Sequence, residues 1–372
     1  SMPSDLDGLR LGSGGATPLR SPNLLNDPVV LRHCVRVDDL EPDTTYYYSV
    51  GDGTPQGWGP WRTVTTGPAR RKRLEFLYLG DAQTGFPSWG TLLSTAFRRH
   101  PGMDAILLAG DLVDRGNERT NWDHFFLRAA TVFDRIPVMP AVGNHEYLDR
   151  GPWLYSSVFR LPEDGPPGAT PGLIYSFRYG SAFFAVLDST AAEKSPTQAA
   201  RQAAWLDEAL ARTDAEWKFV MFHHPIYPSH PVRDYPTIRE HWVPVFDRHH
   251  VDMVLQGHDH AYLRTPPMRA NRRVSTSAEG TTYVVAVSGD KFVSEQPRRD
   301  YIEVGRTNTS TYQTLEIDEL NARLTFRAWT IDGREADSFV IQKPAPVGEL
   351  ARTPAEAGGS RVAESEAAPE RR

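Results

Sequence analysis

The chain has 372 residues, of which 40% are hydrophobic and 24% charged, so it is long enough for one large globular domain and a smaller one. Its net charge of −6 gives no support for nucleic acid or an anionic membrane as a partner, and no apolar run approaches the ~20 residues of a membrane helix. The single cysteine, Cys34, excludes an intrachain disulfide. The first residues lack a charged segment followed by an apolar one, so no signal peptide is visible in them.

Segments of distinct composition flank the middle of the chain. Residues 1–27 are rich in Gly, Ser, Pro and Asn, and we predict a disordered lead-in there. Residues 28–68 hold alternating, β-branched and aromatic patterns, VLRHCVRVDDL, TTYYYSVGDG and GWGPWRTVTT, which predict a small β unit of three or four strands. Residues 344–372 are rich in Ala, Glu, Pro and Gly without aromatic residues, which predicts a disordered tail.

Residues 74–343 alternate between strand and helix patterns and predict one α/β domain. Five apolar runs have strand length: LEFLYLGD, MDAILLAGD, IPVMPAVGNH, WKFVMFHH and VDMVLQGHDH. The clearest helical stretch is 197–212. Near-continuous apolar strands indicate sheets that are covered on both faces. LIYSFRYG and AFFAVLD predict a hairpin that turns near Gly180, and the last two strands predict another at Asp332-Gly333.

Each of the five runs ends on polar side chains of the types that bind metals. These are Asp81, Asp111, Asn144 with His145, His223 with His224, and His258 with His260. Each alone has an ordinary explanation, such as a helix cap for Asp111. In α/β sheets, however, ligands bind outside the carboxyl ends of strands, so these side chains are expected to converge. They are too many for one tetrahedral ion and suit two ions that clamp a phosphoryl displacement.

The order of these motifs resembles that of the calcineurin-like metallophosphoesterases. GD, GDLVD, GNHE, VMFH and GHDH begin at Gly80, Gly110, Gly143, Val220 and Gly257. Within that superfamily the chain is most similar to the purple acid phosphatases and their bacterial relatives, because GHDHAYLR and HHPIYPSH resemble segments of that group. TTYYYSVGDG resembles the end of its amino-terminal fibronectin-III-like domain. GDLVDRG also resembles the serine/threonine protein phosphatases, but the flanking β units and HAYLR argue against that subgroup.

The resemblance covers residues 30–342 and implies both a fold and a reaction. The expected fold is a four-layer αββα sandwich of mixed sheets, after a truncated fibronectin-III-like β unit. The expected reaction is hydrolysis of a small-molecule phosphoester, with monoesters favoured over diesters, by a hydroxide that bridges two ions and attacks phosphorus in line. The ions would be Fe, Mn or Zn. The resemblance also favours a secreted or periplasmic location and leaves the oligomeric state open.

The family's functional residues carry over to matching positions. The first ion would be bound by Asp81 and His260, the second by Asn144, His223 and His258, and Asp111 would bridge them. His145 would hydrogen-bond the phosphoryl oxygen or protonate the leaving group. The further candidates for contact with the substrate are His230, Tyr227 and His224, the last of which is equally well explained as a wall residue.

Two departures from the family pattern affect the first ion. Related enzymes supply a histidine from DxH or a tyrosine from GDxxY, and this chain has Gln83 and Asp114 at those positions. Gln83, Asp114 or water must therefore complete the shell, and we expect a colourless enzyme. For Asp114 we favour a carboxylate that orients and charges His145 through a hydrogen bond, with direct ligation of the first ion as the alternative.

Three other functions stay open at this point. The same site could serve a phosphodiesterase, or a specialised nucleotide or biosynthetic phosphatase. In the last case the loops 148–172 and 262–280 would choose the substrate, because they follow motif ends. A binding or adhesion protein is the third alternative, with the β unit as its working part and a vestigial metal site.

Overall fold

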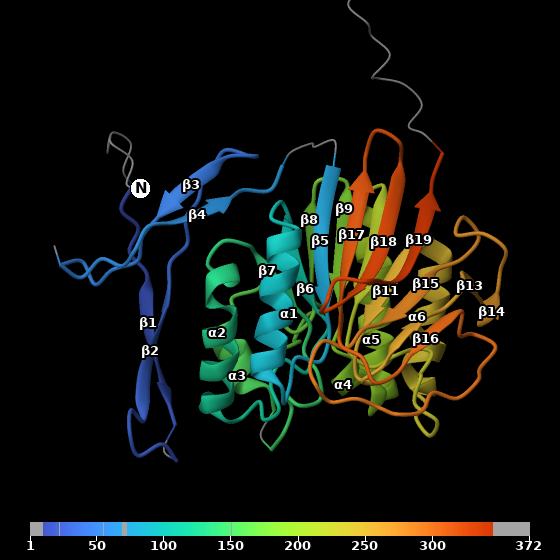
Figure 1. Cartoon of the computed structure of the whole chain (residues 1–372), viewed down its shortest axis with the longest axis horizontal. Coiled ribbons are helices and arrows are strands. Elements are labelled where there is room, and N and C mark those ends of the chain that lie inside the picture. The colour runs from blue at the N-terminus through green and yellow to red at the C-terminus, as the bar shows by residue number, and fades with distance from the viewer. Residues whose placement is uncertain (1–9, 22, 55, 69–72, 150, 345–372) are drawn as a thin grey trace, which may run out of the picture.

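The structure, a computed structural model, describes residues 10–344 except 22, 55, 69–72 and 150. Two β-sheets pack face to face, and helices cover the outer face of each (Figure 1). The helices of the described residues are α1 (Phe86–Arg99), α2 (Arg119–Phe133), α3 (Trp153–Val158), α4 (Ser189–Glu193), α5 (Pro196–Arg212) and α6 (Pro236–His249). The predicted four-layer sandwich is confirmed. Among these helices none combines the length and the apolar character that crossing a membrane requires.

One sheet has seven strands in the order β16-β12-β15-β11-β10-β9-β8. They are β8 (Tyr175–Tyr179), β9 (Ala182–Val186), β10 (Trp217–Met221), β11 (Met253–Gln256), β12 (Tyr262–Arg264), β15 (Thr282–Val285) and β16 (Val304–Arg306). The four strands β9, β10, β11 and β15 are parallel, so their carboxyl ends meet at one edge. The predicted hairpin is confirmed, since β8 and β9 pair across Gly180 and Ser181.

The other sheet has six strands in the order β19-β18-β17-β5-β6-β7. They are β5 (Arg73–Leu79), β6 (Ala105–Leu108), β7 (Val138–Pro140), β17 (Thr311–Asp318), β18 (Arg323–Thr330) and β19 (Glu335–Gln342). β5, β6 and β7 are parallel, whereas β17, β18 and β19 are antiparallel. The hairpin predicted at Asp332-Gly333 joins β18 to β19. All five strands that were predicted to end on polar side chains are present.

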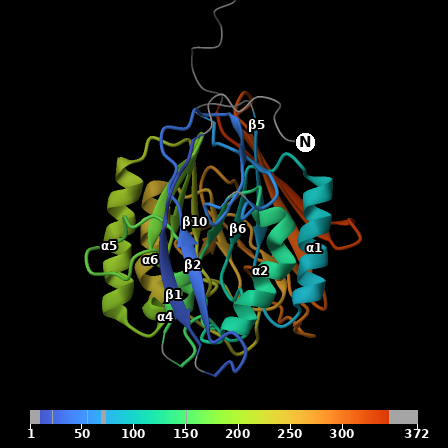
Figure 2. The ribbon, with the colours of Figure 1, turned by 90° about the vertical axis from the view of Figure 1, so that its left-hand side faces the viewer.

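The layers form because successive side chains along each strand point to opposite faces of the sheet. Phe76 and Tyr78 of β5 point between the sheets, where Phe76 packs edge-on against Phe184 with ring centroids 5.0 Å apart. Leu77 of the same strand points outward and packs with α1 and α2. Because both faces are covered, the strands read as almost continuous apolar runs. Figure 2 shows α5 and α6 on one side of the strands and α1 and α2 on the other.

The amino-terminal unit consists of two separate strand pairs. These are β1 (Gly15–Arg20) with β2 (Val29–Cys34), and β3 (Thr45–Tyr48) with β4 (Arg62–Thr65). The predicted disorder of residues 1–27 is therefore wrong for β1, because its backbone pairs with a strand further along the chain and composition does not report such pairing. Residues 1–9 and the predicted tail from 345 onward lie outside the described residues.

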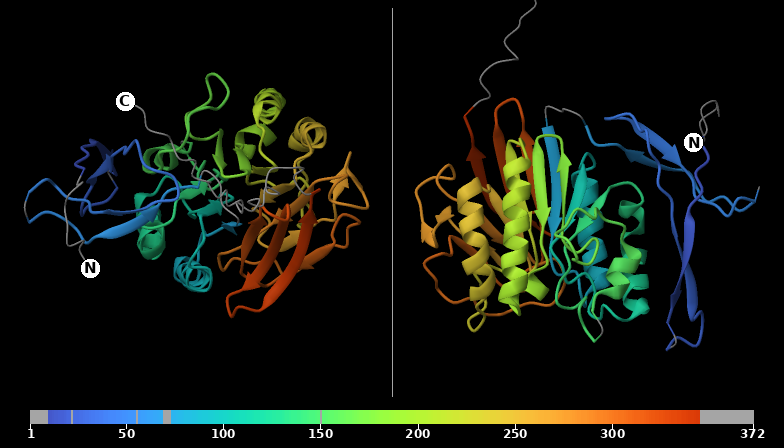
Figure 3. Two further views of the ribbon diagram at one scale, coloured as in Figure 1. Left: turned by 90° about the horizontal axis from the view of Figure 1, so that it is seen from above. Right: turned by 180° about the vertical axis from the view of Figure 1, so that it is seen from behind.

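This unit is attached to both ends of α2. At the start of the helix, Arg119 Nη1 donates to the carbonyl oxygen of Asp27 at 2.7 Å. At its end, Arg62 pairs with the Asp134 carboxylate at 2.8 Å, and the Tyr48 hydroxyl donates to the Asp134 carbonyl at 2.7 Å. Both views in Figure 3 place the unit, drawn in blue, at one end of the sandwich beside this helix.

The two segments that were suspected of choosing the substrate are partly regular. Residues 148–172 contain α3, and residues 262–280 contain β12 followed by the small hairpin β13 (Met268–Arg269) and β14 (Arg272–Arg273). Their role in substrate choice stays a prediction.

Candidate metal centre

The predicted ligands follow parallel strands of both sheets. Asp81 follows β5, Asp111 follows β6, Asn144 follows β7, His223 follows β10, and His258 and His260 follow β11. Residues that lie up to 179 positions apart in the sequence, Asp81 and His260, thus carry donor atoms in contact range, with His260 Nε2 3.6 Å from Asp81 Oδ1. The predicted convergence of strand ends takes place.

One set of donors surrounds His223. Its Nε2 lies 3.0 Å from Asp111 Oδ2, 3.1 Å from Asn144 Oδ1 and 3.0 Å from His258 Nδ1. Its other ring nitrogen, Nδ1, lies 2.9 Å from the carbonyl oxygen of Ala109. Because that carbonyl can only accept, Nδ1 carries the proton and Nε2 of the neutral ring is left for a metal. This is the set that the resemblance assigns to the second ion.

A second set of donors lies beside the first and shares one member with it. Donor atoms of Asp81, Asp111 and His260 lie within 4.8 Å of one another, and so do those of Asp111, His223 and His258. Asp111 alone belongs to both sets. A carboxylate that faces two groups of donors at once is what a bridging ligand between two ions requires.

Four of these residues have a left-handed backbone. The φ angles are 50° at Asp81, 50° at Asp111, 76° at His258 and 52° at His260. Such angles are uncommon for residues other than glycine, because Cβ crowds the backbone. Backbone strain of this kind concentrates at functional sites, where the surrounding structure holds it. Here it turns the chain sharply after a strand.

The Glu146 side chain links the loop after β6 to the loop after β7. Its buried carboxylate accepts hydrogen bonds from the backbone N–H groups of Asp111 at 3.0 Å, Leu112 at 2.9 Å, Val113 at 3.3 Å and Gly143 at 2.7 Å. Gly143 allows this close approach, since a Cβ there would lie 2.3 Å from the Asp111 nitrogen. Glu146 is the last residue of the GNHE motif, and the motif by itself predicted no role for it. Burial and the charge of Asp111 raise its pKa to about 7.

Asp111 and His223 form an ion pair when no ion separates them. Burial by itself would lower the pKa of His223, but the charge of Asp111 and its hydrogen bond outweigh burial and raise the pKa to about 9. Burial would likewise raise the pKa of Asp111, yet the facing imidazolium holds it below its usual value. A metal ion would take the place of that proton.

The remaining candidate donors have the protonation states and unpaired atoms that a metal ion requires. Asp81 Oδ1 and Gln83 Oε1 are buried without a hydrogen-bond partner. Burial holds the pKa of His258 far below its usual value, and burial with the charge of Lys291 lowers that of His260 to about 3, so both imidazoles are neutral. Unpaired oxygens and neutral imidazoles are the ligands that Zn, Mn and Fe take in mixed sites. These residues therefore fit a pair of such ions.

His145 is held beside Asp111 by the main chain of Asp114. Its N–H donates to Asp111 Oδ1 at 2.9 Å, and its ring Nε2 lies 3.9 Å from Asp111 Oδ2. Its Nδ1 lies 2.6 Å from the Asp114 carbonyl oxygen but 3.5 Å from the Asp114 carboxylate. The predicted hydrogen bond to the carboxylate is corrected accordingly, because the turn after β6 presents the carbonyl to the ring. The Asp114 carboxylate belongs to neither donor set.

His224 is buried beside His258, and Tyr227 is buried against Tyr283 and Tyr301. His224 Nδ1 lies 3.0 Å from Ser189 Oγ, and its ring centroid lies 4.4 Å from that of His258, so it forms part of the wall. The Tyr227 hydroxyl donates to Asn271 Oδ1 at 3.0 Å. These contacts account for both residues as packing, and their predicted contact with the substrate stays a prediction.

His230 lies in a loop that a buried acid holds in place. Its N–H donates to Asp259 Oδ2 at 3.1 Å, as the Ser229 hydroxyl does at 3.2 Å, and Arg233 Nη1 lies 3.0 Å from Asp259 Oδ1. Asp259 is the third residue of GHDH, and the motif by itself predicted no role for it. No hydrogen bond joins the His230 ring to a predicted ligand among the described residues, so its contact with phosphate stays a prediction.

Asp188, after β9, is a further buried acid that the sequence analysis missed. Its carboxylate accepts the Tyr147 hydroxyl and the Ala191 N–H, and its own N–H donates to Gln202 Oε1 at 2.9 Å. Burial raises its pKa to about 6. Its place at the end of the run AFFAVLD was the available signal, since it repeats the rule that located the ligands.

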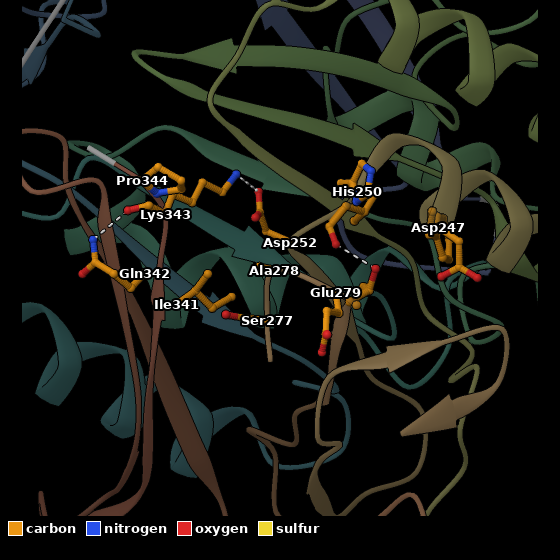
Figure 4. A pocket seen from close by; sticks show the side chains of 14 residues that line it. Asp247, His250, Asp252, Ser277, Ala278, Glu279, Ile341, Gln342, Lys343 and Pro344 are labelled. Carbon is orange, nitrogen blue, oxygen red and sulfur yellow. Dashed lines mark hydrogen bonds and ion pairs between the residues drawn. The ribbon is translucent and has the colours of Figure 1, made fainter. Parts of the chain in front are cut away.

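A cavity of about 200 Å³ lies at the amino end of β11, at the opposite end of the strand from His258 (Figure 4). None of the predicted site residues lines it. Asp252 on its wall pairs with Lys343 at 2.8 Å and accepts the Lys218 N–H at 2.8 Å. The Asp252 carboxylate is thus paired within the protein.

Comparison with known proteins agrees with this geometry. Residues 74–262 match the calcineurin-like phosphoesterase family, and residues 21–66 match the purple acid phosphatase N-terminal domain. An uncharacterised Mycobacterium tuberculosis protein is 31% identical over 66% of this chain and 52% of its own length. Arabidopsis thaliana Fe(3+)-Zn(2+) purple acid phosphatase 12 is 29% identical over 63% and 52%. The phosphoenolpyruvate phosphatase of Allium cepa is 30% identical over 68% and 54%.

The chain therefore spans about half the length of these curated relatives. Among solved structures, a purple acid phosphatase from yellow lupin (Lupinus luteus) seeds matches with a TM-score of 0.74 at 19% identity, over 88% of this chain and 66% of the lupin chain. The structure of PhoD matches with a TM-score of 0.59 at 15% identity, over 86% and 81%. The fold, the order of the motifs and the family match over half of the sequence agree, and the chain belongs to the calcineurin-like phosphoesterases.

Proposed function

We propose that this protein hydrolyses phosphoesters of small molecules at a centre of two metal ions, with monoesters preferred. The observation that carries the proposal is the position of Asp111, which is shared by two sets of buried donor atoms. Relatives whose names include purple acid phosphatase and phosphoenolpyruvate phosphatase support phosphatase chemistry and a monoester substrate.

The residues present divide between the two ions as the resemblance implies. Asp81 and His260 would hold the first ion, Asn144, His223 and His258 the second, and Asp111 would contact both. When bound, such ions supply Lewis acidity toward phosphoryl oxygens and a water acidic enough to attack phosphorus at neutral pH. Fe, Mn and Zn all suit this donor set, and a relative named for Fe(3+) and Zn(2+) is compatible with that range.

His145 is the group placed for proton transfer. Its Nδ1 donates to the Asp114 carbonyl, which fixes the ring and leaves Nε2 toward Asp111. Nε2 is therefore the atom that can hydrogen-bond a phosphoryl oxygen or give a proton to the leaving group. Lys291 adds positive charge near His260, which favours a dianionic monoester over a monoanionic diester.

The test combines metal analysis with turnover. Protein purified without chelators is analysed for Fe, Mn and Zn, and then assayed with p-nitrophenyl phosphate and bis(p-nitrophenyl) phosphate after each metal is added. We expect two ions per chain and faster cleavage of the monoester. Two ions with faster cleavage of the diester would make the protein a phosphodiesterase instead. Absence of bound metal and of turnover on both esters would refute hydrolysis and favour a binding protein with a vestigial site.

A further inference from the structure

The first-ion site is one protein ligand short of the second. Asp81, Asp111 and His260 supply three donors, and neither the histidine of DxH nor the tyrosine of GDxxY is present to add a fourth. The two residues at those positions, Gln83 and Asp114, have very different surroundings. Their contacts identify which of them completes the site.

Gln83 is fully buried with its amide among the first-ion donors. The amide nitrogen lies 3.1 Å from Asp111 Oδ2 and 3.0 Å from His260 Nε2. Donors that share one small ion stand roughly 3 Å apart, because each lies about 2.1 Å from it. The end of the Gln83 side chain therefore already occupies the position of a ligand atom.

The Gln83 amide can turn over without breaking a hydrogen bond to its oxygen. The carbonyl oxygen Oε1 is buried and has no hydrogen-bond partner. A half-turn about the last side-chain bond exchanges oxygen and nitrogen, which are nearly isosteric. It moves Oε1 to the place between Asp111 and His260 and breaks no hydrogen bond made by Oε1. In the metal-free protein the amide NH₂ instead bonds to the Asp111 carboxylate.

Asp114 does not reach the same place. Its side chain is 44% exposed, its carboxylate lies 3.5 Å from His145 Nδ1, and it belongs to neither donor set. An exposed carboxylate outside both donor sets is a poorer candidate for the fourth ligand than the buried Gln83 amide.

We propose that the side-chain oxygen of Gln83 is the fourth protein ligand of the first ion, and that this site therefore takes a divalent ion. The inference rests on the proposed function, because it assumes two bound ions. A neutral amide leaves two carboxylates as the only anionic ligands, one of them shared, so the site lacks the additional negative charge of a tyrosinate that would favour a trivalent ion. It also lacks the phenolate that gives iron sites of this family their colour.

The experiment compares Gln83→Leu, which keeps the size but removes the donor, with Gln83→His, which restores a donor. Asp114→Asn is the matched variant for the rival position. Each protein is loaded with Zn²⁺ or Mn²⁺, its metal content is measured by mass spectrometry, and its affinity is measured by competition with a chelator. We expect about a 100-fold weaker first ion in Gln83→Leu, two tight ions in Gln83→His, and no change in Asp114→Asn.

Other results would separate this inference from the proposed function. Two tight ions in Gln83→Leu, or loss of one in Asp114→Asn, would overturn the role of Gln83 and leave the phosphatase intact. Absence of metal from the unsubstituted protein would overturn the proposed function itself. If Gln83→Leu fails to fold, a crystal structure of the Zn²⁺-loaded unsubstituted protein decides, since an Oε1 more than 3 Å from the ion refutes ligation. A visible tyrosinate band in the iron-loaded protein would also refute it.

Discussion

Buried aspartates lie at both ends of the parallel strands, and they are partnered differently. At the carboxyl ends, Asp81 keeps one buried oxygen without a hydrogen-bond partner, and the ion pairs of Asp111 are with imidazoles. At the amino end of β11, Asp252 has Lys343 and a backbone N–H. Burial raises the pKa of Asp81 and of Asp252 alike, so burial alone does not separate them.

The difference lies in the source of the compensating positive charge. Asp252 receives it from a lysine of the same chain, which completes the fold at that position. Asp81 and Asp111 have no lysine or arginine in an ion pair with them among the described residues, so a bound cation would supply their compensating charge. A buried acid indicates a metal site where no lysine or arginine of the protein compensates its charge.

The sharpest test of this contrast is Asp111→Asn. The substitution removes the charge that both donor sets share and keeps the shape of the side chain. We expect kcat/KM to fall roughly 10³-fold, equal to about 4 kcal/mol of transition-state stabilisation. Metal content should fall as well. Turnover near that of the unsubstituted protein would refute the proposal that the Asp111 carboxylate bridges two ions.

Asp252→Ala should have the opposite pattern. It leaves Lys343 without its carboxylate and the Lys218 N–H without an acceptor. We expect a loss of about 2–3 kcal/mol in the free energy of unfolding, below the range for a fully buried pair because Lys343 is 24% exposed. Denaturant titration measures it, and kcat/KM at 25 °C serves as the control. A fall in metal content would contradict the inference that acids at the amino ends of the strands have no part in metal binding.

Asp188 is an intermediate case, because a tyrosine hydroxyl rather than a cation faces it. Its pKa is raised to about 6 from 3.8, so the folded state keeps a proton that the unfolded chain has released. That stabilisation is complete below pH 3.8 and is lost as pH rises through about 6. Relative to Asp188→Asn, the protein should lose up to about 3 kcal/mol of unfolding free energy between pH 4 and pH 8.

The measurement is urea unfolding of both proteins across that pH range. Subtracting one curve from the other cancels the titration of the histidines and of Glu146. A flat difference would mean that Asp188 stays ionised in the folded state.

Asp114→Asn should have the smallest effect. The ring of His145 is held by the backbone oxygen of residue 114, and asparagine keeps that oxygen. We expect kcat/KM to change by no more than about threefold, as for loss of an exposed ion pair. A loss of 100-fold or more with unchanged metal content would restore the carboxylate–histidine pairing that the sequence favoured.

The strands and the ligand residues of the site were predictable because one rule locates them. Apolar runs of five residues or so mark the strands, and the polar residue after each run marks the edge where ligands gather. The rule works for Asp81 and Asp111 without knowledge of their neighbours. It also covers Asp188, which was passed over because no motif surrounds it.

The features that the sequence did not reveal depend on contacts between residues far apart in the chain or on the backbone. β1 is a strand because β2 lies beside it, and its own composition is that of a loop. Glu146 acts through N–H groups of residues 111–113, more than 30 positions away. The contact from residue 114 to His145 comes from the backbone, and residue type carries no information about a carbonyl oxygen.

The left-handed backbone at Asp81, Asp111, His258 and His260 affects how a mutational scan of this protein should be designed. An L residue other than glycine, asparagine or aspartate carries a cost of roughly 1–2 kcal/mol in this conformation, so alanine at Asp81 or Asp111 adds a backbone cost to the loss of the donor. Asparagine and glycine tolerate the conformation far better. An alanine scan would therefore combine backbone strain with loss of the donor at both aspartates, whereas asparagine suits the backbone and replaces the native donor by an amide oxygen.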